Sequence, residues 1–419
     1  MPPFRIIEHL DDEQDPFDRQ KRISWWHQQA LTDARVLVVG AGAVGNEVLK
    51  NLALLGVGYI LIADFDEVST SNISRTVLFR ADDVGKKKSE VAARRTKDLC
   101  TNTSSSVDWF HGDVVWDLGS GVFRQFDVVL ACLDNVETRL WLNRQCRMVG
   151  VPWIDAGIYE LAVRVNTYLP DHDVCYECTL SSEQRSSARA RYSCDDFKRR
   201  YVQQGRLPTV QIAAALVGAI QVQEAVKLLC KQTVAAGSRI YYQGLNHDFD
   251  VIALPSSKTC SAHVRIPTST SLSFTSDVTL RQLLRYVSTE TAVGPGARIV
   301  LVDRVFVVNA LCRVCEAAVM VRRPAFRVFA DQVVCGACQP GGFPLASTLD
   351  GATRSTQVIA EDRTSEDVLD LTVREIGLPL LHDITIRDHA GRDHFFELSG
   401  DALALMPGRP ISRSRGDGG

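Results

Sequence analysis

The sequence predicts an α/β protein. Its main domain is a doubly wound, Rossmann-like, mostly parallel sheet, and a smaller zinc-containing α+β domain follows. Three observations predict this. Continuous apolar runs alternate with helical patterns in the first half of the chain, as expected for strands that are buried on both faces of a parallel sheet. A glycine-rich turn joins the first run to a helical pattern, and paired cysteines in the second half have the spacing of a zinc site.

The first apolar run, Arg35–Val39, leads into the glycine-rich turn, and the helix after it carries Val48, Leu52 and Leu55 at helical spacing. Further elements are predicted in this order: strands at 59–63, at 127–131 and near Trp153, a long apolar helix after Thr209, and short strands over 240–254.

The character of the sequence changes beyond Arg265. Residues 268–276 are rich in Ser and Thr and predict a linker or loop. Short β-type runs follow, with few long helical patterns. We therefore expect three parts: a first domain over 1–264, a metal-organised α+β domain over 265–407 and a disordered tail over 408–419. The β-type runs lie at 299–302, 305–308 and 326–329.

Composition limits the function classes. The chain has 419 residues, 45% of them hydrophobic and 23% charged, with a net charge of −3, so we expect a globular protein without a strong field that draws it to nucleic acid. The most apolar stretch, 209–229, is interrupted by Gln and Glu, which argues against a membrane span. The N-terminus does not resemble a secretory signal. Twelve cysteines without such a signal favour reduced thiols and a cytoplasmic protein.

The turn Gly40-x-Gly42-x-x-Gly45 lies between a predicted strand and a predicted helix. Its glycines let backbone amides approach a phosphate, and the helix N-terminus carries partial positive charge. Asp64 follows at the distance from which an acidic residue accepts hydrogen bonds from a ribose. NAD and ATP both fit this pattern, and a Rossmann sheet without a nucleotide is the third interpretation.

The segments after Asp64 favour a nucleoside triphosphate. Arg75 and the lysine run 86–88 supply positive charge, which an NAD-dependent oxidoreductase does not need here but a triphosphate does. For any one of these lysines, a solvated helix face is the alternative. Asp134 ends a buried strand at its carboxyl edge, where a carboxylate suits Mg²⁺ held between phosphates.

Together, these motifs resemble the ubiquitin-activating-enzyme superfamily, which includes the ThiF and MoeB adenylyltransferases. The resemblance spans roughly residues 15–260. It implies ATP and Mg²⁺ as cofactors, and adenylation of the C-terminal glycine of a ubiquitin-like protein. The implied nucleotide site consists of Gly40, Gly42, Gly45, Asp64, Asp66, Asn72, Arg75, Lys88 and Asp134.

The resemblance also implies individual roles. Asp64 would accept the ribose hydroxyls, Asn72, Arg75 and Lys88 would contact the phosphates, and Asp134 would bind magnesium. Arg19 resembles an arginine that reaches into the site of a partner subunit, which implies a homodimer. Thr76 departs from the family, in which Gln often stands after the motif's arginine.

Two metal sites are predicted from the cysteines. Cys312-x-x-Cys315 and Cys335-x-x-Cys338 have the spacing of a four-thiolate zinc site; a redox pair or buried thiols are the alternatives. Cys175-x-x-Cys178 stands where the family places half of its zinc site. The other half reads Cys260-x-x-His263, so the resemblance implies a Zn²⁺ site with three cysteines and one histidine, unless His263 is a surface residue.

Cys194 is the predicted nucleophile. Arginines and lysines surround it in the sequence, from Arg185 to Arg200, and nearby cations lower a thiol pKa. Family members that conjugate ubiquitin-like proteins carry their thioester cysteine in this segment, whereas the alternative is an exposed loop cysteine. The cysteines in apolar surroundings are interpreted as core residues: Cys100, Cys132, Cys146 and Cys230.

The predicted function is therefore ATP-dependent activation of a ubiquitin-like protein, followed by thioester formation on Cys194, with a conjugating enzyme as a further partner. The composition and single-chain layout are similar to those of bacterial conjugation enzymes, some of which act in antiphage defence. A sulfur-carrier adenylyltransferase of the thiamine or molybdopterin type is the nearest alternative, although no rhodanese-like segment is recognisable after residue 265. An NAD-dependent oxidoreductase and a zinc-bearing scaffold without turnover are the alternatives from other classes.

Overall fold

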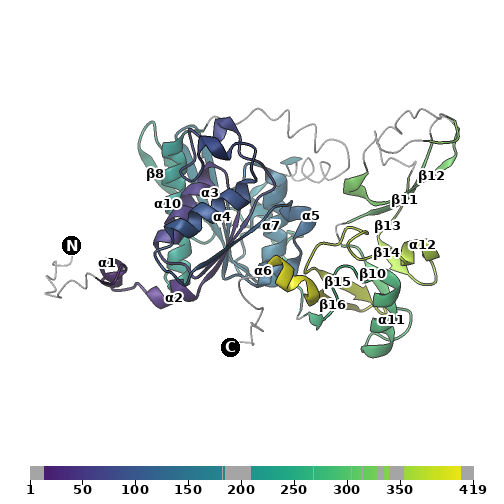
Figure 1. Ribbon diagram of the computed structural model, residues 1–419. Helices are drawn as coiled ribbons and strands as arrows, with labels where there is room; N and C mark the ends of the chain where they lie inside the picture. The colour runs from purple at the N-terminus through teal and green to yellow at the C-terminus, as the bar shows by residue number, and fades with distance from the viewer. Residues whose placement is uncertain are drawn as a thin grey trace.

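A computed structural model describes most of the chain and confirms the predicted fold class. The described residues are 14–181, 183–184, 209–267, 269–302, 304–312, 315–328, 335–338 and 353–406. Figure 1 shows a large α/β body, with the remaining strands gathered on one side of it.

The body is built on an eight-stranded sheet with the order β3-β2-β1-β4-β5-β6-β7-β8. The first five strands in this order are parallel. From β5 onward, each strand pairs antiparallel with the next. The strands are β1 (Arg35–Val39), β2 (Tyr59–Ala63), β3 (Ser106–Phe110), β4 (Val128–Ala131), β5 (Trp153–Tyr159), β6 (Ala162–Tyr168), β7 (Ser238–Gln243) and β8 (Asp248–Ala253).

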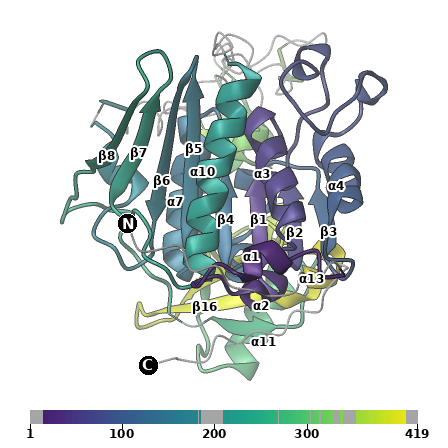
Figure 2. The same cartoon turned by 90° about the vertical axis from the view of Figure 1, so that its left-hand side faces the viewer.

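Helices cover both faces of this sheet, which explains why its central strands are continuously apolar. Val36 and Val38 of β1 belong to one core, whereas Leu37 and Val39 belong to the other. Figure 2 shows α3, α4 and α10 on one face, and α5, α6 and α7 cover the opposite face. The helices are α1 (Asp18–Lys21), α2 (Gln28–Asp33), α3 (Ala43–Leu54), α4 (Lys88–Leu99), α5 (Val114–Asp117), α6 (Ser120–Arg124), α7 (Val136–Val149) and α10 (Gln211–Leu229).

The helix α10 is the only described helix that is long and apolar enough to cross a membrane, and half of its most apolar window is buried within the fold. Its two buried polar side chains have partners there. Gln221 Nε2 donates to the backbone oxygens of Ala131 and Ile154, at 3.1 and 2.8 Å. Glu224 accepts a hydrogen bond from the Ala235 backbone N–H at 2.8 Å. The helix is therefore a core helix of the sheet domain.

The described residues after β8 include two smaller sheets. A five-stranded sheet has the order β14-β10-β15-β16-β9, and a three-stranded sheet has the order β12-β11-β13. The helix α11 packs its apolar face on the larger of the two through Leu280, Leu283, Leu284 and Val287. The elements are β9 (Thr270–Leu272), α11 (Leu280–Glu290), β10 (Arg298–Val300), β11 (Phe306–Leu311), β12 (Ala318–Pro324), β13 (Thr353–Thr356), β14 (Val358–Ala360), α12 (Glu366–Leu369), β15 (Asp383–Arg387), β16 (Asp393–Leu398) and α13 (Ala402–Leu405).

Two local expectations in this part are wrong. The Ser/Thr-rich segment 268–276 contains the strand β9, which pairs in parallel with β16, because its polar side chains suit an edge strand. The strand expected at 326–329 is not formed over its described part. Residues Ala325–Arg327 form a 3₁₀ turn after Pro324, closed by the hydrogen bond from the Val328 N–H to the Ala325 oxygen at 3.1 Å.

The strands β9–β16 and the helices among them, called the second domain below, have a core of their own, and Arg304 attaches them to the sheet domain. Its guanidinium is buried and donates to the Gly377 oxygen and to the Val115 oxygen of α5, both at 2.9 Å. It also lies 5.3 Å from the ring centre of Trp116 and 5.0 Å from that of Trp141. One cation thereby joins the two domains through a hydrogen bond to Val115 and contacts with two tryptophan rings.

A second set of charges supports the same interface. Arg124 of α6 forms ion pairs with the buried Asp383 at 2.7 Å and with Glu397. The Gly119 and Gly121 N–H groups donate to the oxygens of Leu380 and Leu381, each at 2.8 Å. The second domain is therefore held on the α5–α6 side of the sheet domain, as Figure 1 also shows.

Candidate active site

The glycine-rich turn follows β1 at the carboxyl edge of the sheet. At two of its glycines there is no room for a side chain. Gly40 has φ +95°, and a Cβ there would lie 2.4 Å from the Cys132 oxygen. A Cβ on Gly45 would lie 2.0 Å from the Gly40 oxygen. Gly42 is different, because nothing lies within 4 Å of its Cβ position. Gly42 also caps the N-terminus of α3, so the open side of the turn coincides with the positive end of a helix.

Asn46, which sequence analysis missed, holds this turn in place. Its buried side-chain N–H groups donate to the oxygens of Ala41 and Gly42, at 2.8 and 3.0 Å. Its oxygen accepts from the Leu78 N–H at 2.9 Å. The segment that carries Arg75 is therefore attached to the glycine turn through one side chain. The available signal was an amide directly after Gly45, in the first turn of the predicted helix.

Asp64 lies at the end of β2, against the glycine turn. Its two oxygens accept hydrogen bonds from the N–H groups of Ala41 and Asp66, both at 2.7 Å. Burial raises the pKa of Asp64, although Lys88 and these hydrogen bonds oppose the shift. Lys88, at the start of α4, forms an ion pair with Asp66 at 2.8 Å. The structure thus brings together the glycine turn, both carboxylates and Lys88.

The motif from Asn72 to Thr76 forms a tight turn. The Asn72 oxygen Oδ1 accepts from the Ser69 N–H at 2.9 Å. The Thr76 hydroxyl donates to the Asn72 backbone oxygen at 2.9 Å. Thr76, the departure from the family pattern, is therefore buried and stabilises the turn. Arg75 donates from Nη1 to the Thr209 hydroxyl at 2.8 Å.

Asp134 is exposed just after β4, on the same edge of the sheet as the glycine turn. The next residue, Asn135, caps α7 by accepting a hydrogen bond from the Thr138 N–H at 2.8 Å. Arg139, which sequence analysis also missed, anchors the loop that carries Asp134. It is buried, pairs with Asp155 at 2.6 Å and donates to the Leu133 oxygen at 2.5 Å. Asp134 is thus presented on a rigid support.

The first candidate metal site brings Cys175, Cys178, Cys260 and His263 together, with all ligand atoms within 4.8 Å of one another. The Cys175 sulfur lies 3.6 Å from that of Cys178 and 3.7 Å from that of Cys260. The Cys178 sulfur lies 3.3 Å from the His263 Nε2. A tetrahedral zinc with Zn–S bonds of about 2.3 Å needs sulfurs about 3.8 Å apart. The donor set and its spacing therefore fit Zn²⁺.

The second candidate metal site lies at the end of the β11–β12 hairpin and brings together Cys312, Cys315, Cys335 and Cys338. The sulfurs of Cys312 and Cys338 are 3.6 Å apart, as are those of Cys315 and Cys335. The same tetrahedral spacing applies. Four thiolates at this spacing fit a closed, structural zinc site that joins the hairpin to the segment 335–338.

The remaining predicted site residues are Cys194 and Arg19. Cys194 lies outside the described residues. Arg19 is exposed on α1. The core interpretation fits the buried Cys146 and Cys230. The thiol of Cys132 lies 3.5 Å from the Gln221 oxygen, and burial raises its pKa, which makes it unsuitable as a thiolate nucleophile.

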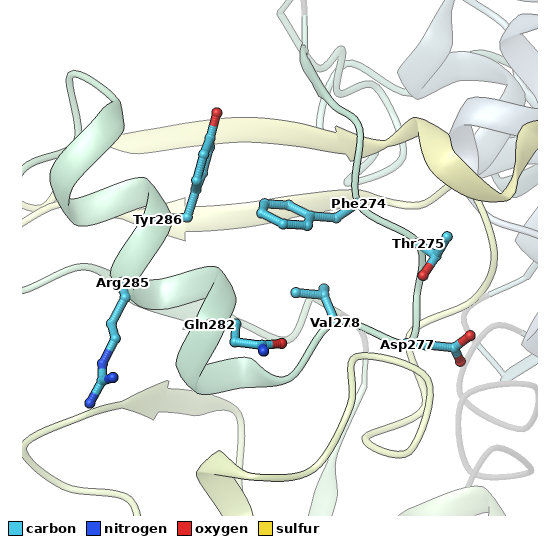
Figure 3. A pocket seen from close by; sticks show the side chains of 7 residues that line it. All are labelled: Phe274, Thr275, Asp277, Val278, Gln282, Arg285 and Tyr286. Atoms are coloured by element: carbon cyan, nitrogen blue, oxygen red, sulfur yellow. The ribbon is translucent and has the colours of Figure 1, made fainter.

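A separate open groove, with a cavity volume of about 550 Å³, lies on the second domain. Figure 3 shows Phe274 and Tyr286 at its centre, with ring centres 5.0 Å apart in an edge-to-face contact. The groove is formed by α11 and the segment before it. None of the predicted nucleotide or metal ligands lines it, so it is not part of the candidate active site.

Comparisons with known proteins identify the family. A model of the ThiF family matches residues 17–262. The SAMP-activating enzyme E1 of Haloferax volcanii is 31% identical over 240 residues, which cover 56% of this chain and 81% of that protein. The SUMO-activating enzyme subunit 2 of Dictyostelium discoideum is 38% identical over 149 residues, covering 35% of this chain and 22% of that protein.

The NEDD8-activating enzyme E1 catalytic subunit of Caenorhabditis elegans is 31% identical over 195 residues, covering 42% of this chain and 44% of that protein. The chain thus spans less than half the length of the SUMO and NEDD8 subunits. A crystal structure of E. coli MccB with AMPCPP and MccA has a TM-score of 0.50 at 23% identity, over 60% of this chain and 74% of that one; this likeness concerns the fold. Because the family model matches more than half of the sequence, this protein belongs to the ThiF family.

Proposed function

We propose that this protein uses ATP to adenylate the C-terminal carboxylate of a ubiquitin-like protein. The observation that carries the proposal is the arrangement at the carboxyl edge of the sheet. There, an open helix N-terminus at Gly42 lies beside the acidic pair Asp64 and Asp66 and the cation Lys88. The likeness to the SAMP-activating enzyme, which extends over 81% of that protein, supports the choice of a ubiquitin-like substrate.

In this proposal the chain binds and orients ATP. Asp64 keeps acceptor capacity for the ribose hydroxyls, since each carboxylate oxygen has two lone pairs and only one N–H bonds to each. The phosphates lie against the N-terminus of α3. Lys88, which pairs with Asp66 in this structure, exchanges that partner for a phosphate oxygen, and Arg75 supplies the second cation. Asp134 would hold Mg²⁺, which neutralises charge on the phosphates.

The chemical step is then attack of the substrate carboxylate oxygen on the α-phosphorus. An acyl-adenylate forms, and the bond to the pyrophosphate leaving group breaks. Lys88 and Arg75 stabilise negative charge that develops on the phosphates, and the rigid loop limits the geometries that ATP can sample. The two zinc sites take no part in this step. Their closed donor sets suit a structural role.

The second step of the proposal uses Cys194. Its thiolate attacks the acyl carbon, a thioester forms, and AMP leaves. A conjugating enzyme would then receive the modifier, in a bacterial pathway of the kind that includes antiphage conjugation. Adenylation of a sulfur carrier is the alternative, and in that case Cys194 is not needed. We further propose a cytoplasmic homodimer in which Arg19 reaches the partner's site. The free state of all described cysteines suits a reducing compartment.

The test is ATP–pyrophosphate exchange with candidate ubiquitin-like proteins that end in glycine, encoded near this gene. Wild-type protein should support exchange and form an adduct that reducing agents cleave. The Cys194→Ala variant should keep exchange and lose the adduct, whereas Arg75→Met and Lys88→Met should lose both. A Cys194→Ala variant with full transfer of the modifier would favour the sulfur-carrier alternative. Absence of exchange with every candidate, in protein that binds ATP, would refute adenylation of this substrate class.

A further inference from the structure

Thr209 connects the triphosphate site to the start of α10. Its hydroxyl accepts the hydrogen bond from Arg75 Nη1 at 2.8 Å. Its backbone pairs with Glu160 in a parallel bridge, so the β5–β6 turn fixes its main chain. Two residues later, Gln211 donates to Glu47 of α3 at 3.0 Å. The Thr209 hydroxyl is therefore presented from a backbone that is attached to two separate elements of the sheet domain.

Arg75 has one of its donors committed to Thr209 and another without a partner. Its Nε atom is buried, and no hydrogen-bond acceptor for it lies among the residues that the structure describes. A buried N–H of a charged group without an acceptor is costly. The protein therefore orients this guanidinium through one nitrogen, and a ligand can supply the hydrogen-bond acceptor for the other. An anionic oxygen is the acceptor that a guanidinium binds most strongly.

We propose that Thr209 is a positioning residue that holds the Arg75 guanidinium so that its remaining N–H groups face the phosphates of ATP. The inference rests on the proposed function, in which Arg75 contacts those phosphates. An arginine side chain has rotamer entropy to lose when it binds a ligand, and a hydroxyl on a fixed backbone removes part of that loss before ATP arrives. Thr209 itself does not touch the nucleotide.

The experiment compares Thr209→Val with Thr209→Ser in the full-length protein. Valine keeps the shape and removes the acceptor, whereas serine keeps the acceptor. Titration with Mg·ATP and with adenosine gives the two binding constants. We expect Thr209→Val to weaken Mg·ATP binding by about tenfold, the lower end for a hydrogen bond to a charged group, and to leave adenosine binding unchanged. Thr209→Ser should restore most of the Mg·ATP affinity.

Steady-state exchange adds a second readout. Thr209→Val should raise the KM for ATP with little change in kcat, since the hydroxyl acts on ATP binding. A double-mutant cycle then tests whether Thr209 acts through Arg75. In an Arg75→Met background, Thr209→Val should have no further effect on Mg·ATP binding.

Each outcome decides the inference. Equal Mg·ATP affinity for wild type and Thr209→Val overturns it, as does an additive effect in the Arg75→Met background. Parallel loss of Mg·ATP and adenosine binding in Thr209→Val also overturns it, because the residue would then only support the fold. Failure of the wild-type protein to bind Mg·ATP is a distinct result, which refutes the proposed function itself.

Discussion

The three glycines of the turn provide a sharp test, because the structure assigns them different roles. Gly45 is required by packing, since a Cβ there would lie 2.0 Å from the Gly40 oxygen. Gly42 has free space around its Cβ position and an ordinary φ of −74°. We expect Gly45→Ala to damage the fold and Gly42→Ala to damage only nucleotide binding.

The magnitudes follow from these contacts. For Gly45→Ala, the carbonyl must move by more than 1 Å to reach an ordinary contact, and such overpacking costs about 1–3 kcal/mol or more. The gain in helix propensity, about 1 kcal/mol, does not offset it. For Gly42→Ala, loss of a good N-cap residue costs up to about 1 kcal/mol. The lower entropy of the unfolded alanine chain returns about 0.4–1 kcal/mol, so stability should change little.

Urea unfolding and Mg·ATP titration measure the two effects separately. Gly45→Ala should lower the urea midpoint clearly. Gly42→Ala should unfold as the wild type does but bind Mg·ATP at least tenfold more weakly, because the new methyl group occupies the side of the turn where the phosphates approach. A Gly42→Ala variant with wild-type affinity would refute the placement of the phosphates, and a fully stable Gly45→Ala variant would refute the packing argument.

Three further predictions concern the interface and the metal sites. Burial raises the pKa of Asp113 to about 6, so the folded state holds this proton more tightly than the unfolded chain does. The free energy of unfolding should therefore fall as pH rises from about 4 to about 6, by at most ~1.4 kcal/mol per pH unit. Urea unfolding of Asp113→Asn, which keeps the cap on α5, should lack this component, and an unchanged pH profile would contradict the assignment. Arg304→Met removes the donors to the Gly377 carbonyl of its own domain and to the Val115 carbonyl across the interface. It should lower the unfolding free energy by about 2–4 kcal/mol, measured by urea unfolding with the exposed Arg363→Met as control. Cys312→Ser should remove one of two zinc equivalents, measured by metal analysis, and should leave Mg·ATP binding intact; loss of both equivalents would show that the two sites are not independent.

The parts of the fold that were predicted correctly are those with strong local patterns. The strands at Arg35–Val39 and 59–63 are buried on both faces, so their sequences are continuously apolar, and the structure has both with these bounds. The Cys-x-x-Cys pairs also carry their geometry in their spacing. By contrast, β9 is a three-residue edge strand of Thr, Ser and Leu. Its partner β16 lies more than a hundred residues away in the sequence, so no local pattern distinguishes it from a linker.

The site residues that sequence analysis missed act through contacts between distant segments. Asn46 joins the glycine turn to Leu78, and Arg139 joins the Asp134 loop to Asp155. Both are buried polar side chains, and in the sequence each is one polar residue on an amphipathic helix. Thr209 follows the same rule, since its partner Arg75 lies far away along the chain. Tertiary contacts of this kind depend on how the sheet brings the loops together.

The most direct test of the central claim is a crystal structure of the protein with Mg·ATP bound. We expect the triphosphate at the N-terminus of α3 beside Gly42, the ribose hydroxyls on Asp64, and Lys88 released from Asp66 onto a phosphate oxygen. A nicotinamide dinucleotide bound in that position instead, or an empty cleft at saturating Mg·ATP, would contradict it.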